Sequence, residues 1–143
     1  MATRTTSTAT TTAYGSITIV DVTDVGEFFA TPESNMPTTV IYDPNTNEYN
    51  PSWLVVQNGN NTSGTPLTLS VAARYAGNPV VPGQLYSIKW YQRNGTEPWP
   101  NEQTGEVSTN SANDVYVNEY RELIVKNNIL GASVKIVTFR CVV

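Results

Sequence analysis

The side chains that could do chemistry are concentrated in the polar passage Thr96–Asn113. Glu97, Glu102 and Glu106 place three carboxylates in one predicted loop, and paired carboxylates are the groups that glycosidases use. Carboxylates of a polar loop are more often solvated surface, so we expect no catalysis from them. The chain has no histidine, which excludes Ser-His-Asp and Cys-His catalysis and imidazole-based zinc sites. The sequence therefore predicts a protein that is not an enzyme and holds no cofactor.

An aromatic platform is the second candidate site. Trp99 stands between two prolines, and Tyr91 and Tyr116 are expected nearby, so the three rings could stack on a sugar. The competing interpretation, which we favour, is that Trp99 packs beneath its own loop or against a sister subunit. Any adhesive role is expected on the 96–113 loop, because loops on a rigid scaffold commonly carry recognition.

A calcium loop is the third candidate. Asp43, Asn45 and Asn47 have the spacing of oxygen ligands that opens such a loop. However, Glu48 stands sixth, where glycine is needed, and Leu54 stands twelfth, where a bidentate glutamate is needed. We predict an Asx turn here and no metal.

Two strands are expected to form the centre of the fold. In Leu67–Tyr75 apolar and polar residues alternate strictly, as in a half-buried strand. The run Gln84–Gly95 places Tyr86, Ile88 and Trp90 on one face and ends in an Asn-Gly turn. Together they predict the nucleus of a β-sandwich around Trp90.

The rest of the chain is predicted as short strands and loops. The expected strands are Ser16–Val22, Thr38–Tyr42, Ser52–Gln57, Glu106–Ser108, Glu119–Lys126 and Ser133–Val143. The last is expected to face inward with Val137, Phe139, Cys141 and Val143, and Asn58–Gly64 is predicted as a loop.

Composition limits the function classes. At 143 residues the chain is one ordinary domain, and its net charge of −4 with only eight dispersed basic residues argues against nucleic acid. One cysteine cannot form an intrachain disulfide. No segment has the apolar length of a membrane span, and the N-terminus lacks the apolar core of a signal peptide. We interpret the Asn-x-Ser/Thr patterns at Asn60, Asn61 and Asn94 as chance in an Asn- and Thr-rich chain.

The N-terminus is low in complexity and rich in threonine. We predict that residues 1–15 form an extended arm that anchors the protein on a partner, since such a segment cannot order itself alone. An incidentally ordered tail is the alternative. The expected docking residues are Thr3, Arg4, Thr5, Thr6 and Thr8, followed by Ile17 and Ile19.

The pattern over residues 52–143 resembles an immunoglobulin-like domain. Trp90 in Lys89-Trp90-Tyr91 matches the strand-C tryptophan, Cys141 in Phe139-Arg140-Cys141 the strand-F cysteine, and Val71 the strand-B partner. The resemblance implies an all-β immunoglobulin-like β-sandwich without its disulfide. Strand G is missing after Val143. Either the native chain continues, which we favour, or another segment such as 16–22 of this chain or a neighbour supplies it.

The segments 14–24 and 37–53 resemble parts of bacteriophage and prophage virion proteins that introduce immunoglobulin-like modules of head fibres, tail fibres or capsid decorations. The resemblance implies three regions: the arm 1–15, an attachment region 16–51 and the sandwich 52–143. It implies a structural protein of the virion, assembled in the host bacterial cytoplasm, that contacts capsid or tail proteins and is a homo-oligomer, a trimer if it forms a fibre base. A host surface glycan is a further partner to consider, and a soluble carbohydrate-binding module using Trp99 is the alternative function. No membrane or nucleic-acid partner is expected.

Overall fold

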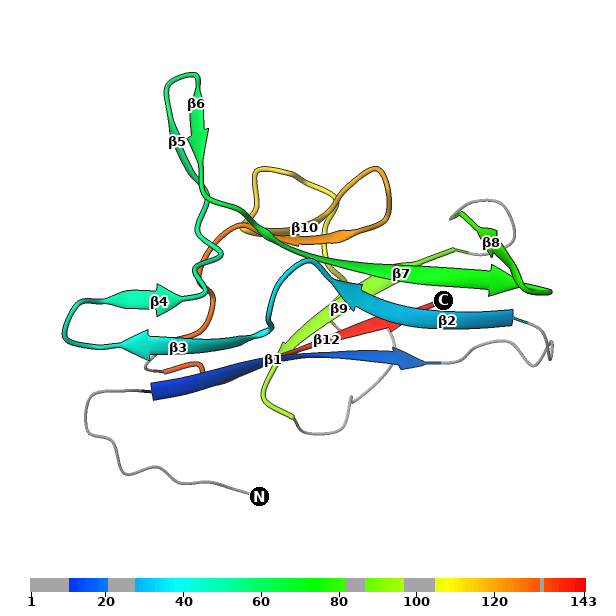
Figure 1. Ribbon diagram of the computed structural model, residues 1–143, viewed down its shortest axis with the longest axis horizontal. Coiled ribbons are helices and arrows are strands. Elements are labelled where there is room, and N and C mark those ends of the chain that lie inside the picture. The colour runs from blue at the N-terminus through cyan, green and yellow to red at the C-terminus, as the bar shows by residue number, and fades with distance from the viewer. Residues whose placement is uncertain (1–10, 21–27, 82–86, 97–104, 132) are drawn as a thin grey trace.

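The computed structural model describes residues 11–20, 28–81, 87–96, 105–131 and 133–143, and this part of the chain is all-β (Figure 1). The strands are β1 (Thr11–Val20), β2 (Phe28–Ser34), β3 (Thr39–Asp43), β4 (Glu48–Asn50), β5 (Val56–Asn58), β6 (Asn61–Ser63), β7 (Leu67–Tyr75), β8 (Asn78–Val80), β9 (Lys89–Asn94), β10 (Val115–Val117), β11 (Leu123–Val125) and β12 (Ile136–Val142). The all-β prediction is confirmed.

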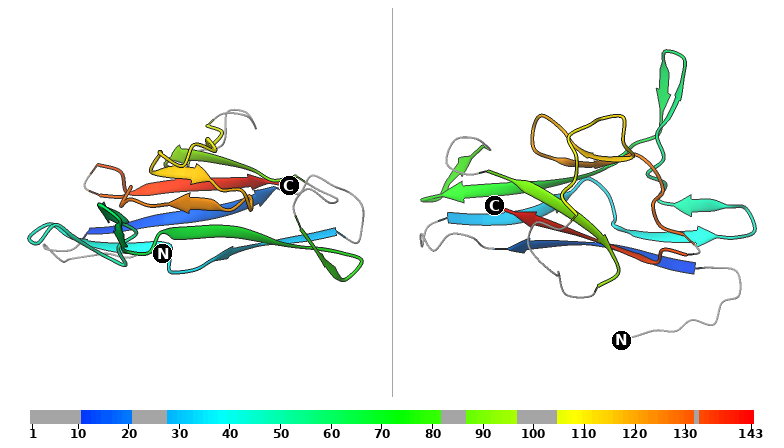
Figure 2. Two further views of the ribbon diagram at one scale, coloured as in Figure 1. Left: turned by 90° about the horizontal axis from the view of Figure 1, so that it is seen from above. Right: turned by 180° about the vertical axis from the view of Figure 1, so that it is seen from behind.

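Two sheets make up the body of the molecule. One has the strand order β4-β3-β1-β12-β9, and the other has the order β10-β11-β7-β2, with β8 also paired to β7. Figures 1 and 2 show β7 and β2 lying over β1, β12 and β9, while the separate hairpin β5–β6 extends away from both sheets. The core lies between the layers and contains Trp53, Trp90, Phe139, Leu67 and Leu69, each at most 1% exposed. Each such side chain contributes roughly 1.5–3 kcal/mol by leaving water.

Strand β7 follows its predicted alternation. Leu67, Leu69 and Ala73 are buried, Val71 is half-buried, and Tyr75 is exposed at the strand's end. Edge strand β2 was not predicted, since its sequence contains proline and lacks alternation. Hydrogen-bonded and non-bonded residue pairs alternate along an antiparallel ladder. The Asn35 N–H donates to the Thr68 carbonyl at 3.1 Å, so the even-numbered residues of β7 are at the bonded positions. Pro32 lies opposite Val71, which is at a non-bonded position. Pro32 therefore loses no ladder bond.

Strand β12 is buried on both faces. The predicted inward residues Val137, Phe139, Cys141 and Val143 are indeed buried, but Thr138 and Arg140 on the opposite face are only 8% exposed as well. The predicted shared face is confirmed, and burial of the second face is an addition that the sequence did not predict. Alternation alone could not separate a half-buried strand from one inside a sheet that is covered on both sides.

Strand β1 lies beside β12 within the same chain. It pairs in parallel with β12 from Tyr14↔Ile136 to Val20↔Val142, and its first residues pair antiparallel with β3. Residues 11–15, assigned to the arm by the sequence, belong to this strand. Residues 16–51 contribute strands to both sheets, so this stretch is part of the sandwich architecture.

Three other expectations need correction. Ser52–Gln57 is not a strand except at its end, although Trp53 is buried within the core. The predicted loop 58–64 instead contains the turn and second strand of hairpin β5–β6, in which Gly59 at φ 62° takes the first central position of a two-residue turn. The expected strand 106–108 is a single bridge from Glu106 to Tyr91.

Candidate functional site

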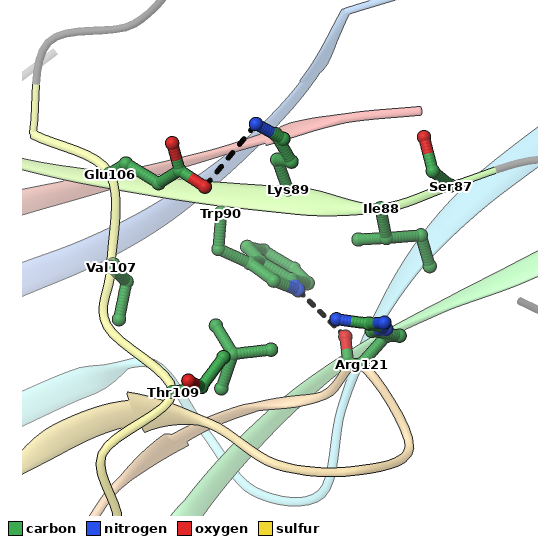
Figure 3. Close-up of a pocket in the computed structure, with 9 residues that line it drawn as sticks. Ser87, Ile88, Lys89, Trp90, Glu106, Val107, Thr109 and Arg121 are labelled. Carbon is green, nitrogen blue, oxygen red and sulfur yellow. Dashed lines mark hydrogen bonds and ion pairs between the residues drawn. The ribbon is translucent and has the colours of Figure 1, made fainter.

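A hollow of about 240 Å³ opens beside Trp90, where the start of β9 faces the segment 105–109 and the β10–β11 connection (Figure 3). Its apolar walls are Ile88, Trp90, Val107 and Val117, and Thr109 and Arg121 add polar groups. Backbone bonds from Gln92 N–H to Gly105 C=O (2.8 Å) and from Val107 N–H to Trp90 C=O (2.8 Å) hold segment 105–107 against β9.

The tryptophan ties the two sheets together at this end. Trp90 is 1% exposed, and its indole Nε1–H donates to the backbone oxygen of Arg121 at 2.9 Å. Arg121 has φ 63°, in the left-handed region that is costly for a residue with a side chain. The indole bond therefore helps to fix a strained turn over the core.

Asn118 builds that turn. Its side-chain oxygen accepts the backbone N–H groups of Tyr120 and Glu122, both at 2.9 Å, and its amide nitrogen donates to the Glu122 carboxylate at 2.8 Å. These bonds leave the Arg121 side chain exposed. It lines a second, wider hollow of about 640 Å³ together with Thr109, Ser111, Tyr116, Asn118 and Glu119.

The carboxylate candidates do not form a catalytic pair among the described residues. Figure 3 shows Glu106 paired with Lys89 on the side of β9 opposite Trp90, and the two charged groups lie 3.5 Å apart. Both side chains are about half exposed, so the pair contributes at most about 1 kcal/mol. Glu97 and Glu102 lie outside the described residues.

The described ranges hold no cluster of three or more His, Cys, Asp or Glu residues that could bind a metal ion. At the calcium candidate, the Asp43 carboxylate accepts the Asn45 backbone N–H at 2.8 Å, which is the predicted Asx turn. The Tyr42 hydroxyl donates to Asn47 Oδ1 at 3.0 Å and closes the β3–β4 turn. Burial raises the pKa of Tyr49, and the nearby Tyr42 raises it further.

The predicted aromatic platform is not assembled by the described residues. Tyr91 is 3% exposed, so its ring offers no open stacking face. Tyr116 is half-buried and has Lys126 Nζ 5.5 Å from its ring centroid. Trp99 lies outside the described residues.

Of the predicted docking residues, only two lie among the described residues. Thr3, Arg4, Thr5, Thr6 and Thr8 lie outside the described residues. Ile17 and Ile19 occupy register positions in β1 opposite Phe139 and Cys141 of β12.

Cys141 is a core residue. It is fully buried, and this burial raises the pKa of its thiol to about 12. A thiol that keeps its proton is a poor nucleophile.

Sequence reasoning did not single out Asn118 or Arg121. The sequence placed Arg121 in an expected strand Glu119–Lys126, and this was wrong in its first half. Only Leu123–Val125 form a strand, and the polar residues 118–122 form the turn.

The comparisons with known proteins add no relative. No family model, no curated protein and no solved structure matches the chain. Within the described part of the chain, no helix has the length and apolar character needed to cross a membrane.

Proposed function

We propose that the protein is a non-enzymatic structural component of a bacteriophage particle, in which an immunoglobulin-like sandwich is attached to capsid or tail proteins through its N-terminal arm. The observation that carries this proposal is the place of β1 along β12. Because β1 is built into a sheet, the proposal assigns attachment to residues 1–10, and the sandwich acts as a spacer or weak adhesin.

The strand pairing supports the immunoglobulin-like assignment. An immunoglobulin domain has strands A, B, E and D in one sheet and C, F and G in the other. The order β2-β7-β11-β10 corresponds to A-B-E-D, and the pair β9–β12 corresponds to C-F. The pairing of Trp90 on β9 with Cys141 on β12 supports the strand-C and strand-F roles that the resemblance implies.

The departures from that family concern strand G. Strand β1 lies where strand G is expected, but it runs parallel to β12, whereas strand G is antiparallel to strand F. Strands β3 and β4 extend the same sheet beyond β1. Because the chain's own β1 covers this edge of β12, a strand from a neighbour is not needed there.

The absence of an intrachain disulfide from the core is consistent with assembly in a reducing cytoplasm. An immunoglobulin-like domain assembled in a reducing bacterial cytoplasm cannot rely on a disulfide, and buried Cys141 with half-buried Val71 gives an apolar contact region instead. We propose that the protein acts as a homo-oligomer in the particle, a trimer if it forms a fibre base.

The experiment is density-gradient sedimentation of lysate from producing cells, followed by detection of the native protein. The proposal predicts that the protein runs with assembled particles and stays there after salt washing. Recovery only at the top of the gradient, as free protein, would refute it.

A carbohydrate-binding module is the second candidate, favoured by the wide hollow at Tyr116. Its lining combines an aromatic ring with the hydroxyl, amide and carboxylate groups of Thr109, Ser111, Asn118 and Glu119, which is the kind of surface that binds sugars. Under this function Tyr116→Ala and Trp99→Ala would abolish binding to a glycan array. Under the particle role both variants would sediment with particles as the native protein does.

A further inference from the structure

Two Asn-Gly pairs with identical chemistry occupy very different structural settings. Asn58-Gly59 is at the tip of hairpin β5–β6, and Asn94-Gly95 is at the end of β9. An asparagine followed by glycine is prone to deamidation, because the backbone nitrogen of the unhindered glycine can reach the asparagine side-chain carbonyl. The reaction requires that nitrogen to be free and the local backbone to rearrange.

The Asn58 pair meets both requirements. Every residue of β5 and β6 is exposed, so neither face of the hairpin is packed against the body. In the part of the chain that the structure describes, the Gly59 N–H donates to no acceptor. A two-stranded hairpin without a packed face is marginally stable, and its local opening is therefore frequent.

The Asn94 pair is held in place from both sides of the glycine. Gly95 N–H donates to the Ile136 carbonyl at 2.9 Å, and the Thr138 hydroxyl donates to the Gly95 carbonyl at 2.7 Å. Thr138 is itself buried. Freeing the Gly95 nitrogen requires this end of β9 to separate from β12, its neighbour in the five-stranded sheet.

We propose that Asn58 is a deamidation site of the native protein and that the fold protects Asn94. The Gly59 nitrogen gives up its proton and bonds to Asn58 Cγ. The Cγ–Nδ2 bond then breaks, the Nδ2 group takes up a proton and departs as ammonia, and a five-membered succinimide ring remains. Water then opens the ring at one of its two carbonyls and gives aspartate or isoaspartate. The net change consumes one water and replaces the neutral amide by a carboxylate, with the nitrogen released as ammonium.

The chemical consequence is local and large. Residues 54–66 contain no charged side chain, so the reaction gives hairpin β5–β6 its first negative charge. The isoaspartyl product also adds a methylene to the backbone of a turn that depends on Gly59 at φ 62°. Any partner surface that binds the hairpin would therefore contact a hairpin of altered charge and backbone as the protein ages.

The test is peptide mass spectrometry on the purified full chain incubated at mildly alkaline pH, with isoaspartate detected by enzymatic methylation. In the folded protein, Asn58 should deamidate at least about tenfold faster than Asn94, which corresponds to a difference of about 1.4 kcal/mol in opening free energy. In denaturant the two rates should converge, because only local sequence remains. A folded-state ratio below about tenfold would overturn the proposal, as would a ratio that persists in denaturant.

Discussion

Trp90 and Cys141 lie directly opposite each other on the antiparallel strands β9 and β12, and both side chains are buried, at 1% and 0% exposure. Opposite residues of an antiparallel pair project from the same face, so the indole and the thiol enter the same core. Both residues were predicted from the sequence to be in the core. The Trp90 indole also fixes the β10–β11 turn, because its Nε1–H donates to the backbone oxygen of Arg121.

Because the Cys141 thiol is buried, the free energy of unfolding should fall as pH rises in the alkaline range. The thiol has an ordinary pKa of 9.0, and burial raises the pKa to about 12 in the folded protein. The unfolded chain therefore loses this proton first, and the contribution to folding is complete below pH 9.0 and is lost as pH rises toward about 12. Urea unfolding of wild-type protein and Cys141→Val should show a difference in unfolding free energy that shifts against the wild type across this window. A difference independent of pH would contradict the assignment.

The indole bond of Trp90 can be measured against a matched tryptophan. Trp53 is also 1% exposed, but its Nε1–H has no hydrogen-bond partner in the described structure. Trp90→Phe and Trp53→Phe remove similar volumes, and only the first removes a bond. We expect Trp90→Phe to lower the unfolding free energy by about 1 kcal/mol more than Trp53→Phe. Equal losses by denaturant titration would show that the bond to Arg121 contributes nothing net.

The β7–β8 turn offers a stabilising substitution. Ala76 has φ 49° and Gly77 has φ 80°, which is a two-residue turn with both central residues in the left-handed region. Ala76→Gly removes a steric cost of roughly 1–2 kcal/mol and adds an entropy cost of roughly 0.5–1 kcal/mol. The melting temperature should therefore rise slightly. The control Ala72→Gly, at an exposed position within β7, should lower it. A fall for both variants would contradict the turn assignment.

Strands with a clear apolar pattern could be read from the sequence, whereas the seven-residue β2, which contains proline and lacks alternation, and several three-residue strands could not. Strand β7 carries its own alternation over nine residues. Strands β4, β8 and β10 have three residues each, which is too short for a period to appear. The pairing of β1 with β12 depends on the register between distant segments, which a local pattern does not contain. The candidate ligand surface was located only in part, since Tyr116 was identified but Asn118 and Arg121 act through a turn geometry that composition does not reveal.

The attachment role is tested most directly by removing residues 1–10, because a deletion through residue 15 would also cut into β1. Cells producing the particle would express either the full chain or the shortened chain, and the fraction that sediments with particles would be measured for each. We predict that the shortened protein leaves the particle fraction while its melting temperature stays unchanged, since every strand that the structure describes remains. A shortened protein that keeps its fold and still sediments with particles would contradict attachment through the arm.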